Sequence, residues 1–514
     1  MRQQSARSSN NTLRRSLWWT FSGLLLTSIE PASAANEGAR HPPLLNDVPG
    51  LRHVVTPGDS RPSLLLAQTA ATGEIGQPAA RGEDPPRLFD GQFDMENEVE
   101  VLTNKVENIS LVRREPRDNL RSSEQELQLQ ARYRSGQWLS ALGEIKIIHE
   151  QAGYTDVRQD QHESMLERGE IWAHFARLFA SDFSLRIGRQ NFVEPRRWWW
   201  DDDLDAVRLY YSRDPLRFYA GVAEELGRKS SGDKFIDPEQ DKVRRFIGHA
   251  NWRLAEGLTL GTFYLAQRDR SSRHAVDAVI ETEREDLSDA NLRWFGLRAS
   301  GETTLASGDI LSYWADTAEV NGDETTFEYL EQTPSSSLVN TRSTRRVRGR
   351  AIDLGVAWAP LMWRNPTLTI SHARGTGDQN QNDGIDSNYR QTGLQDQDEE
   401  FRNYGELLRP ELSNLSIFAT TFGFSVHTRT RVTLGYHRFR QLHPAPFLRS
   451  ARIESNPNGV DKRIGSETSL LIEIREWKNI QIDLVAATFT AGRAFGDEAG
   501  CQARSTFAKL TYKF

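Results

Sequence analysis

Basic residues that alternate with apolar ones are the part of this sequence best suited to chemistry. Between residues 126 and 134 every second residue is apolar, and the residues between them include Arg132 and Arg134. A guanidinium is always charged and binds carboxylate or phosphate groups through paired hydrogen bonds. A row of such groups can hold an anion at several weak sites and let it move on. The same alternation sets apart further basic residues: Lys146, Arg186, Arg208 and Arg217.

Residue patterns typical of enzymes are absent from the sequence. The eleven histidines are scattered without an H-E-x-x-H spacing, Cys501 is the single cysteine, and serine and histidine are too dispersed for a lipase dyad. Residues 375–378 (GTGD) open a loop and lack the strand–helix context of a nucleotide site. Asp201, Asp202 and Asp203 follow three tryptophans and are weak Ca²⁺ candidates, with a solvated loop as the other interpretation. We therefore expect no enzymatic activity, no cofactor and no other metal.

Such alternation requires β-strands, because successive side chains of a strand point to opposite faces. Residues 87–514 contain repeated alternating segments of about 10–15 residues. They predict eighteen strands, at 88–102, 121–135, 137–150, 165–178, 181–190, 203–213, 215–225, 243–255, 257–268, 289–300, 304–318, 346–360, 364–374, 411–427, 429–440, 464–476, 479–491 and 503–514.

The connections between these strands alternate between short and long. Short turns such as Ser135-Gly136 and Ser300-Gly301 are separated by long polar segments, among them 319–345 and 375–409. Outer-membrane barrels have short periplasmic turns and long extracellular loops, and they need no long apolar run, in agreement with the mean hydropathy of −0.61. We expect an all-β, 18-stranded antiparallel transmembrane β-barrel, with the loops 319–345 and 375–409 outside the cell.

The residues before the barrel have a different composition. Arginines, a short apolar stretch and Ala32-Ser33-Ala34 predict a cleaved signal peptide at residues 1–34. Residues 35–86 are rich in proline, glycine and alanine, which predicts a disordered periplasmic linker. The last alternating segment ends on Phe514, and bacterial barrels commonly end in such a strand with a terminal aromatic residue. The barrel domain is thus 87–514, and the expected location is the bacterial outer membrane.

The apolar face of each strand indicates which charges point into the lumen. A charged side chain facing lipid at mid-membrane costs roughly 2–4 kcal/mol, so charges within strands should point inward. The lumen should then be electropositive, although the formal net charge of the chain is −7. In the alternative, arginines and glutamates pair with one another and line a general porin. The inward acidic candidates are fewer than the basic ones: Glu144, Glu170, Asp353, Glu473 and Asp483.

Several blocks resemble the alginate export family of outer-membrane barrels, over most of residues 88–514. The resemblance implies an 18-stranded barrel whose arginine-lined pore conducts a polyuronate and is occluded at rest by loops or turns. It also implies pore or gate roles for Arg186, Arg189, Asp353 and Arg409. The blocks are 186–190 (RIGRQ), 352–358 (IDLGVAW), 372–377 (HARGTG), 391–394 (QTGL), 405–406 (GE), 409–415 (RPELSNL) and 492–496 (GRAFG).

These features predict a channel that exports an anionic exopolysaccharide, alginate or a similar polyuronate, with a general or small-anion porin as the alternative. The expected partners are the anionic polysaccharide, outer-membrane lipid, the barrel assembly machinery and periplasmic polysaccharide-export scaffold proteins. No nucleic-acid partner is expected. The expected substrate path comprises Arg132, Arg134, Lys146, Arg186, Arg189, Arg208, Arg217, Asp353 and Arg409.

Overall fold

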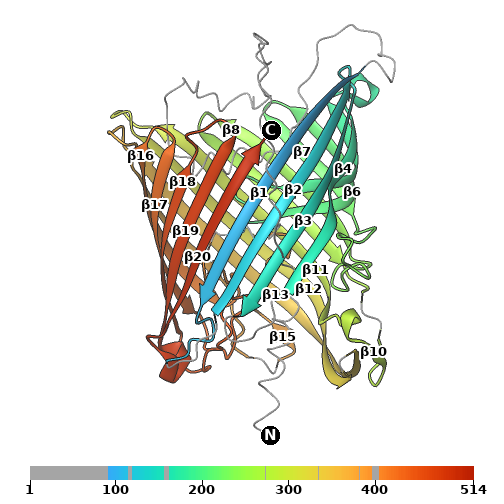
Figure 1. The fold of residues 1–514 in the computed structure, drawn as a ribbon, viewed down its shortest axis with the longest axis vertical. Coiled ribbons are helices and arrows are strands. Elements are labelled where there is room, and N and C mark those ends of the chain that lie inside the picture. Colours follow the sequence, from blue (N-terminus) through green and yellow to red (C-terminus); the bar gives the residue numbers. More distant parts are fainter. Residues whose placement is uncertain are drawn as a thin grey trace.

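The wall of the protein is one antiparallel sheet that closes on itself (Figure 1). The structure, a computed structural model, describes residues 91–113, 119–154, 161–271, 274–333, 335–380, 383–395 and 404–514. Within these residues eighteen strands form the ring, and β1 pairs with β20 to complete it. The fold class expected from the sequence is confirmed. The wall strands are β1 Gln92–Glu107, β2 Asn119–Ser135, β3 Leu139–Tyr154, β4 Gln161–Phe175, β5 Phe183–Val193, β6 Asp201–Arg213, β7 Leu216–Ala223, β8 Arg244–Ala255, β9 Leu258–Arg268, β11 Ser288–Thr304, β12 Ile310–Thr333, β13 Ser336–Ala359, β14 Thr367–Gly375, β16 Leu415–His427, β17 Thr430–Gln441, β18 Arg463–Ile474, β19 Ile480–Ala491 and β20 Gln502–Lys513.

Alternation along each strand gives the wall its two faces. On β13, Ile352, Leu354 and Trp358 lie on the outer face with 38–44% of their surface exposed, whereas Ala351 and Asp353 on the opposite face are 2% and 3% exposed. An apolar outer face suits contact with lipid, and the opposite face is left for charged and small side chains. The alternation read from the sequence is therefore the alternation of the barrel.

The two ends of the barrel differ in their connections. Where β1 begins and β20 ends, the strands are joined by short turns, such as 136–138 and 256–257. At the other end the connections include 224–243, 376–414 and 442–462. Outer-membrane barrels place their long loops outside the cell, and we name the two ends periplasmic and extracellular accordingly.

One expected loop is a paired hairpin instead. Residues 319–345, expected to be a loop, continue β12 and β13 as strands of 24 residues each. Their polar composition suggested a loop, but opposite charges face each other across the hairpin. Asp323 lies opposite Arg346, and Glu319 lies opposite Arg350 with 3.1 Å between the charged atoms. Such cross-strand pairs stabilise the extended part of the hairpin.

Two short strands add to the extracellular part of this hairpin. β10 (Val279–Glu281) pairs antiparallel with β13, and β15 (Ile385–Asp386) pairs parallel with it. β15 belongs to the connection between β14 and β16, which was expected to be an extracellular loop. That connection is therefore fixed to the hairpin on the extracellular side.

The segments before the barrel, 1–34 and 35–86, lie outside the described residues, so the expected signal peptide and linker stay predictions. No described helix is long and apolar enough to cross a membrane. The final strand is bonded into the ring up to its end: the N–H of Phe514 donates to the carbonyl of Asn97 (3.0 Å), and the N–H of Asn97 donates to the carbonyl of Phe514 (3.2 Å). The terminal aromatic residue thus closes the seam between β20 and β1.

A tag inserted at Asp383 tests this topology. Asp383 is exposed in the long connection next to β15, so the tag should be labelled by an impermeant reagent on intact cells. A tag in the turn at 256–257 should be labelled only after the outer membrane is ruptured. The reverse pattern would show that the two ends are assigned the wrong way round.

Candidate functional site

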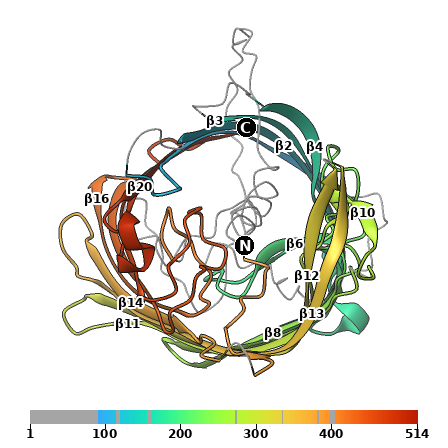
Figure 2. The same ribbon diagram turned by 90° about the horizontal axis from the view of Figure 1, so that it is seen from below.

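The wall is interrupted where β5 and β6 leave it. β4 pairs with β5 only over residues 171–175. Farther toward the extracellular end, the backbone of β4 forms hydrogen bonds with the β7–β8 connection instead. The N–H of Arg168 donates to the carbonyl of Lys229 (3.1 Å), and the N–H of Ser231 donates to the carbonyl of Leu166 (2.8 Å). The outer parts of β5 and β6 are free to bend inward, and Figure 2 shows β6 inside the ring.

Gly188 marks the point where β5 parts from β4. Its φ is 122°, a region that side chains other than glycine rarely adopt. A Cβ atom at this position would lie 2.2 Å from the carbonyl oxygen of Ile171 and 2.9 Å from Cα of Trp172. Glycine therefore allows β5 to approach β4 closely while it turns into the lumen.

Residues 186–208, here called the inserted hairpin, pack against the connection 376–414, here called the lumen loop. At the tip of the hairpin, Trp198, Trp199 and Trp200 are at most 1% exposed. The indole N–H of Trp198 donates to the hydroxyl of Tyr404 over 2.6 Å, and the amide of Gln395 donates to the carbonyl of Trp198 over 3.0 Å. Both segments thus lie within the ring and pack on each other (Figure 2).

Ion pairs hold the hairpin tip against β11, β12 and β13. Arg298 on β11 contacts Glu194 of the tip and Asp316 on β12, with 2.5 Å between its Nε and Asp316 Oδ1. Arg196 of the tip contacts Asp316 and lies 3.1 Å from Asp353. These five side chains, here called the latch, are between 1% and 8% exposed. Burial by itself would raise the pKa of Glu194, but the Arg298 guanidinium holds this pKa below its ordinary value.

Asp353 joins the wall to both inserted segments. Its Oδ1 accepts hydrogen bonds from Arg196 and from the indole N–H of Trp314 (2.7 Å), and its Oδ2 accepts one from the hydroxyl of Tyr404 (2.8 Å). Removing one partner of a buried ion pair costs roughly 3–5 kcal/mol. Asp353 was predicted from the sequence as a gate residue. Removing its carboxylate would therefore weaken the contacts of both the inserted hairpin and the lumen loop with the wall.

The sequence analysis did not identify Glu194, Arg196, Asp316 or Tyr404. Residues 194–200 (EPRRWWW) carried a usable signal, because a triple tryptophan beside charges predicts a buried apolar segment with polar anchors. The partners of this segment lie more than a hundred residues away in the sequence, and no local pattern connects them.

Arg186 and Arg208 face inward, as expected from the alternation. The guanidinium of Arg186 lies 4.1 Å from the ring centre of Trp172. The guanidinium of Arg208 lies 4.1 Å from the ring centre of Phe192. Arg208 also donates to Oε1 of Gln190 and to a backbone carbonyl on β5, each over 3.0 Å. Within the described residues, the hydrogen-bond and ring partners of Arg208 are thus all neutral.

The other basic residues of the expected path differ in position. Arg132 and Arg217 lie on the inward faces of β2 and β7. Arg189 lies on the opposite face of β5 from Arg186 and contacts Glu225 of the β7–β8 connection over 2.9 Å. Arg409 is part of the lumen loop and donates to a backbone carbonyl of that loop over 3.1 Å.

The wall from β1 to β4 carries more inward carboxylates than expected. Residues directly opposite in an antiparallel pair share a face, so Glu96 and Glu98 lie inward with Gln130 and Gln128. The acidic candidates named from the sequence did not include these glutamates, although Phe93, Met95, Val99 and Val101 alternate with the acids of β1 and mark the opposite face. Ion pairs within this wall or with the neighbouring β20 include Arg134 with Asp94 (3.2 Å), Lys146 with Glu126 (3.4 Å), Lys509 with Glu100 (2.7 Å) and Lys513 with Glu98 (2.9 Å).

The three aspartates considered as Ca²⁺ ligands begin β6. Alternation places Asp202 on the opposite face from Asp201 and Asp203. Asp201 lies 3.1 Å from Arg197, and the side chain of Asn191 donates to Asp203 over 3.1 Å. The solvated loop considered for this segment is wrong, because Asp201 and Asp203 are 5% and 7% exposed within a strand.

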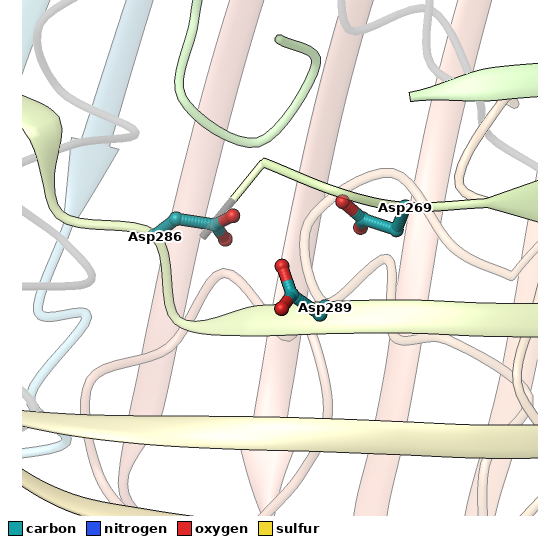
Figure 3. A group of neighbouring side chains, drawn as sticks. All are labelled: Asp269, Asp286 and Asp289. Atoms are coloured by element: carbon teal, nitrogen blue, oxygen red, sulfur yellow. The ribbon is translucent and has the colours of Figure 1, made fainter. Parts of the chain in front are cut away.

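A different group of carboxylates is arranged as a cation site would be. In the described part of the chain, Asp269, Asp286 and Asp289 are the group of three whose ligand atoms lie within 4.8 Å of one another (Figure 3). Burial is the main cause that raises the pKa of Asp286 to about 7. An all-oxygen set suits a hard cation such as Ca²⁺. No sequence motif marked these residues.

The family model for alginate export matches residues 144–509. The chain belongs to the alginate export family. The barrel is also similar to solved structures: OccK7 (OpdD) of Pseudomonas aeruginosa has a TM-score of 0.51 and 14% identity, over 83% of this chain and 99% of its own. OccAB1 of Acinetobacter baumannii has a TM-score of 0.50 and 8% identity, over 83% and 97%. At such identities the likeness shows the fold alone. No curated protein matches the chain.

The family and the fold make this protein a β-barrel channel of the bacterial outer membrane. In an alginate export barrel with this geometry, the passage is narrowed at the extracellular half by the inserted hairpin and the lumen loop. The latch joins the tip of the inserted hairpin to the wall strands β11, β12 and β13.

Replacing Arg298 with glutamine should release the hairpin. The change leaves Glu194 and Asp316 buried without their shared cation, at a cost of roughly 3–5 kcal/mol. Single-channel conductance in planar bilayers should therefore rise above that of the wild type. R350Q is the matched control, because it removes only an exposed pair with Glu319, worth at most about 1 kcal/mol. Equal conductance in folded R298Q and wild type would contradict the latch.

Proposed function

We propose that this barrel exports an anionic exopolysaccharide, alginate or a similar polyuronate, through an arginine-lined part of its lumen. The observation that carries the proposal is that Arg208, on the inward face of β6 opposite Arg186, has hydrogen-bond and ring partners that are all neutral in the described part of the chain. An arginine already paired with a carboxylate has its charge satisfied. Arg208 keeps a charge that no carboxylate of the described residues neutralises, and because this residue is only 4% exposed, a carboxylate of the polymer can meet it only after the inserted segments have moved.

The aromatic rings around this arginine suit transient binding. The guanidinium lies 4.8 Å from the ring centre of Tyr210 and 5.0 Å from that of Tyr219, besides Phe192. These contacts hold the guanidinium in place at a modest energy, about 0.5–2 kcal/mol each. A polymer with a carboxylate on each sugar can then exchange sites without a large reorganisation. Export needs weak binding at several sites, because tight binding at one would trap the chain.

Opening is part of the same proposal. The inserted hairpin and the lumen loop contact each other and the wall, so both must move for a polymer to pass the extracellular half. The latch contains two arginines and three carboxylates that contact one another in one geometry. A partial shift would leave a carboxylate buried without its arginine, which favours two discrete states over a continuous range.

A general or small-anion porin is the second candidate, and one observation favours it. The inward charges of β1 to β4 are largely matched in ion pairs, which is how a passage without a strong preference would be lined. The two functions differ in whether a polyuronate occupies the pore.

Periplasmic scaffold proteins and the barrel assembly machinery belong to the export proposal as partners.

Neutralising the two aromatic-bound arginines tests the proposal. In planar bilayers under a salt gradient, R186Q/R208Q should lose anion selectivity relative to the wild type. The polyuronate concentration that half-blocks the wild-type current should rise about tenfold, because a hydrogen bond to a charged group contributes roughly 1.5–3 kcal/mol. R213Q is the control, since Arg213 lies at the periplasmic end of β6 with its side chain 72% exposed.

The outcomes separate the candidates. Loss of selectivity together with weaker polymer block supports export. Loss of selectivity in a channel that polyuronate never blocks, in wild type or variant, supports the porin. Unchanged selectivity and block in the double variant, and in R186Q alone, would contradict a role for these arginines.

A further inference from the structure

Four arginines gather on the outer face of the barrel near its extracellular end. They are Arg374 on β14, Arg438 and Arg440 on β17, and Arg463 on β18, here called the outer arginine cluster, and all four are exposed. They face outward because Arg438 and Arg440 continue the outer row of β17 that contains Leu434 and Tyr436, 48% and 37% exposed.

Strand pairing brings the four side chains together. Ser416 on β16 lies between Arg374 on one side and Arg440 on the other. Arg440 in turn lies opposite Arg463. Directly opposed residues have Cα atoms about 4.5–5.5 Å apart, and neighbouring strands are about 4.8 Å apart. The guanidiniums therefore share one patch across four strands, with the hydroxyl of Ser416 in the middle.

Like charges opposite each other destabilise a sheet unless something neutralises them. Elsewhere on the outer face, arginines near this end have carboxylate partners: Arg350 lies 3.1 Å from Glu319, and Arg244 lies 2.8 Å from Glu224. For the outer arginine cluster, no side-chain carboxylate partner occurs among the residues that the structure describes. The nearest acid along the chain is Asp461, which accepts a bond from the backbone N–H of Arg463 instead (2.8 Å).

The position of the cluster indicates which anion meets it. Directly toward the periplasm on the same face lie Phe418 and Phe422, 41% and 43% exposed, as part of the surface that contacts lipid chains. The cluster is therefore at headgroup level in the outer leaflet. An anion that is covalently attached to acyl chains can occupy the cluster and cover this apolar surface at the same time, which a soluble anion cannot do. Guanidiniums bind phosphate through paired, charge-assisted hydrogen bonds.

We propose that the outer arginine cluster binds the phosphate groups of a phosphorylated glycolipid of the outer leaflet, the lipid A part of lipopolysaccharide. Its phosphates neutralise the opposed arginines of β17 and β18, while its acyl chains lie on the aromatic outer face of β16. The bound lipid ties together four strands that precede and follow the lumen loop. This site goes beyond the transport function and does not depend on the exported polymer.

The test is a titration of the purified full-length protein in detergent with diphosphoryl lipid A, read by native mass spectrometry. The wild type should bind it, and fully dephosphorylated lipid A should bind at least about tenfold more weakly, since each charge-assisted hydrogen bond lost corresponds to roughly a factor of ten. R374Q/R438Q/R440Q should show the same weakening. R244Q/R350Q, which removes two outer arginines with carboxylate partners, should bind like the wild type.

Two results would overturn the proposal. One is equal lipid A binding in the triple variant and the wild type, with R463Q measured as a second variant should the triple variant not fold. The other is displacement of lipid A by soluble polyuronate at equal charge, which would make the cluster a contact for the exported polymer instead.

Discussion

Backbone hydrogen bonding within the membrane is the constraint on which this structure depends. An unpaired N–H or C=O facing lipid costs several kcal/mol, so a barrel strand cannot lose its neighbour without a replacement. β5 leaves β4 beyond Gly188, and residues 229–231 take its place along the exposed edge. The β7–β8 connection is thus what permits a hairpin of the wall to enter the lumen. Its contact with the hairpin through Glu225 and Arg189 couples the replacement to the inserted element.

The latch has a second physical role besides stability. Buried ion pairs contribute little net stabilisation, because desolvation offsets most of their attraction. What they impose is geometry: Arg298 has to meet Glu194 and Asp316 together, and Asp353 has to meet Arg196, Trp314 and Tyr404. A hairpin that shifted slightly would break several of these contacts at once. The arrangement therefore specifies one position of the hairpin and makes departure from that position cooperative.

The sequence predicted the wall well because a barrel repeats one local rule. Alternation alone placed Arg186, Arg208 and Asp353 on the inward face, and the lengths of the connections indicated the two ends. It failed where pairing is not local. Residues alternate along β5 in the same way whether or not the strand is paired with β4. The pattern therefore could not predict that β5 leaves β4 at Gly188. It also failed for the 319–345 hairpin, where opposite charges on two strands replace the apolar residues by which strands are recognised.

Arginine occurs in this barrel in three environments, and the partner of each determines what it can do. Arg298 is enclosed by two carboxylates, so its charge is committed to the fold. Arg208 is held by neutral groups and rings, so no carboxylate among the described residues neutralises its charge, and the proposed export assigns that charge to the polymer. Arg440 faces a second arginine on the outer surface, and the proposed lipid phosphate is the anion that would neutralise the two. The net charge of −7 does not reveal these three environments. The partners of each guanidinium, rather than the number of arginines, distinguish the arginine that holds the fold from those proposed to contact the polymer and the lipid.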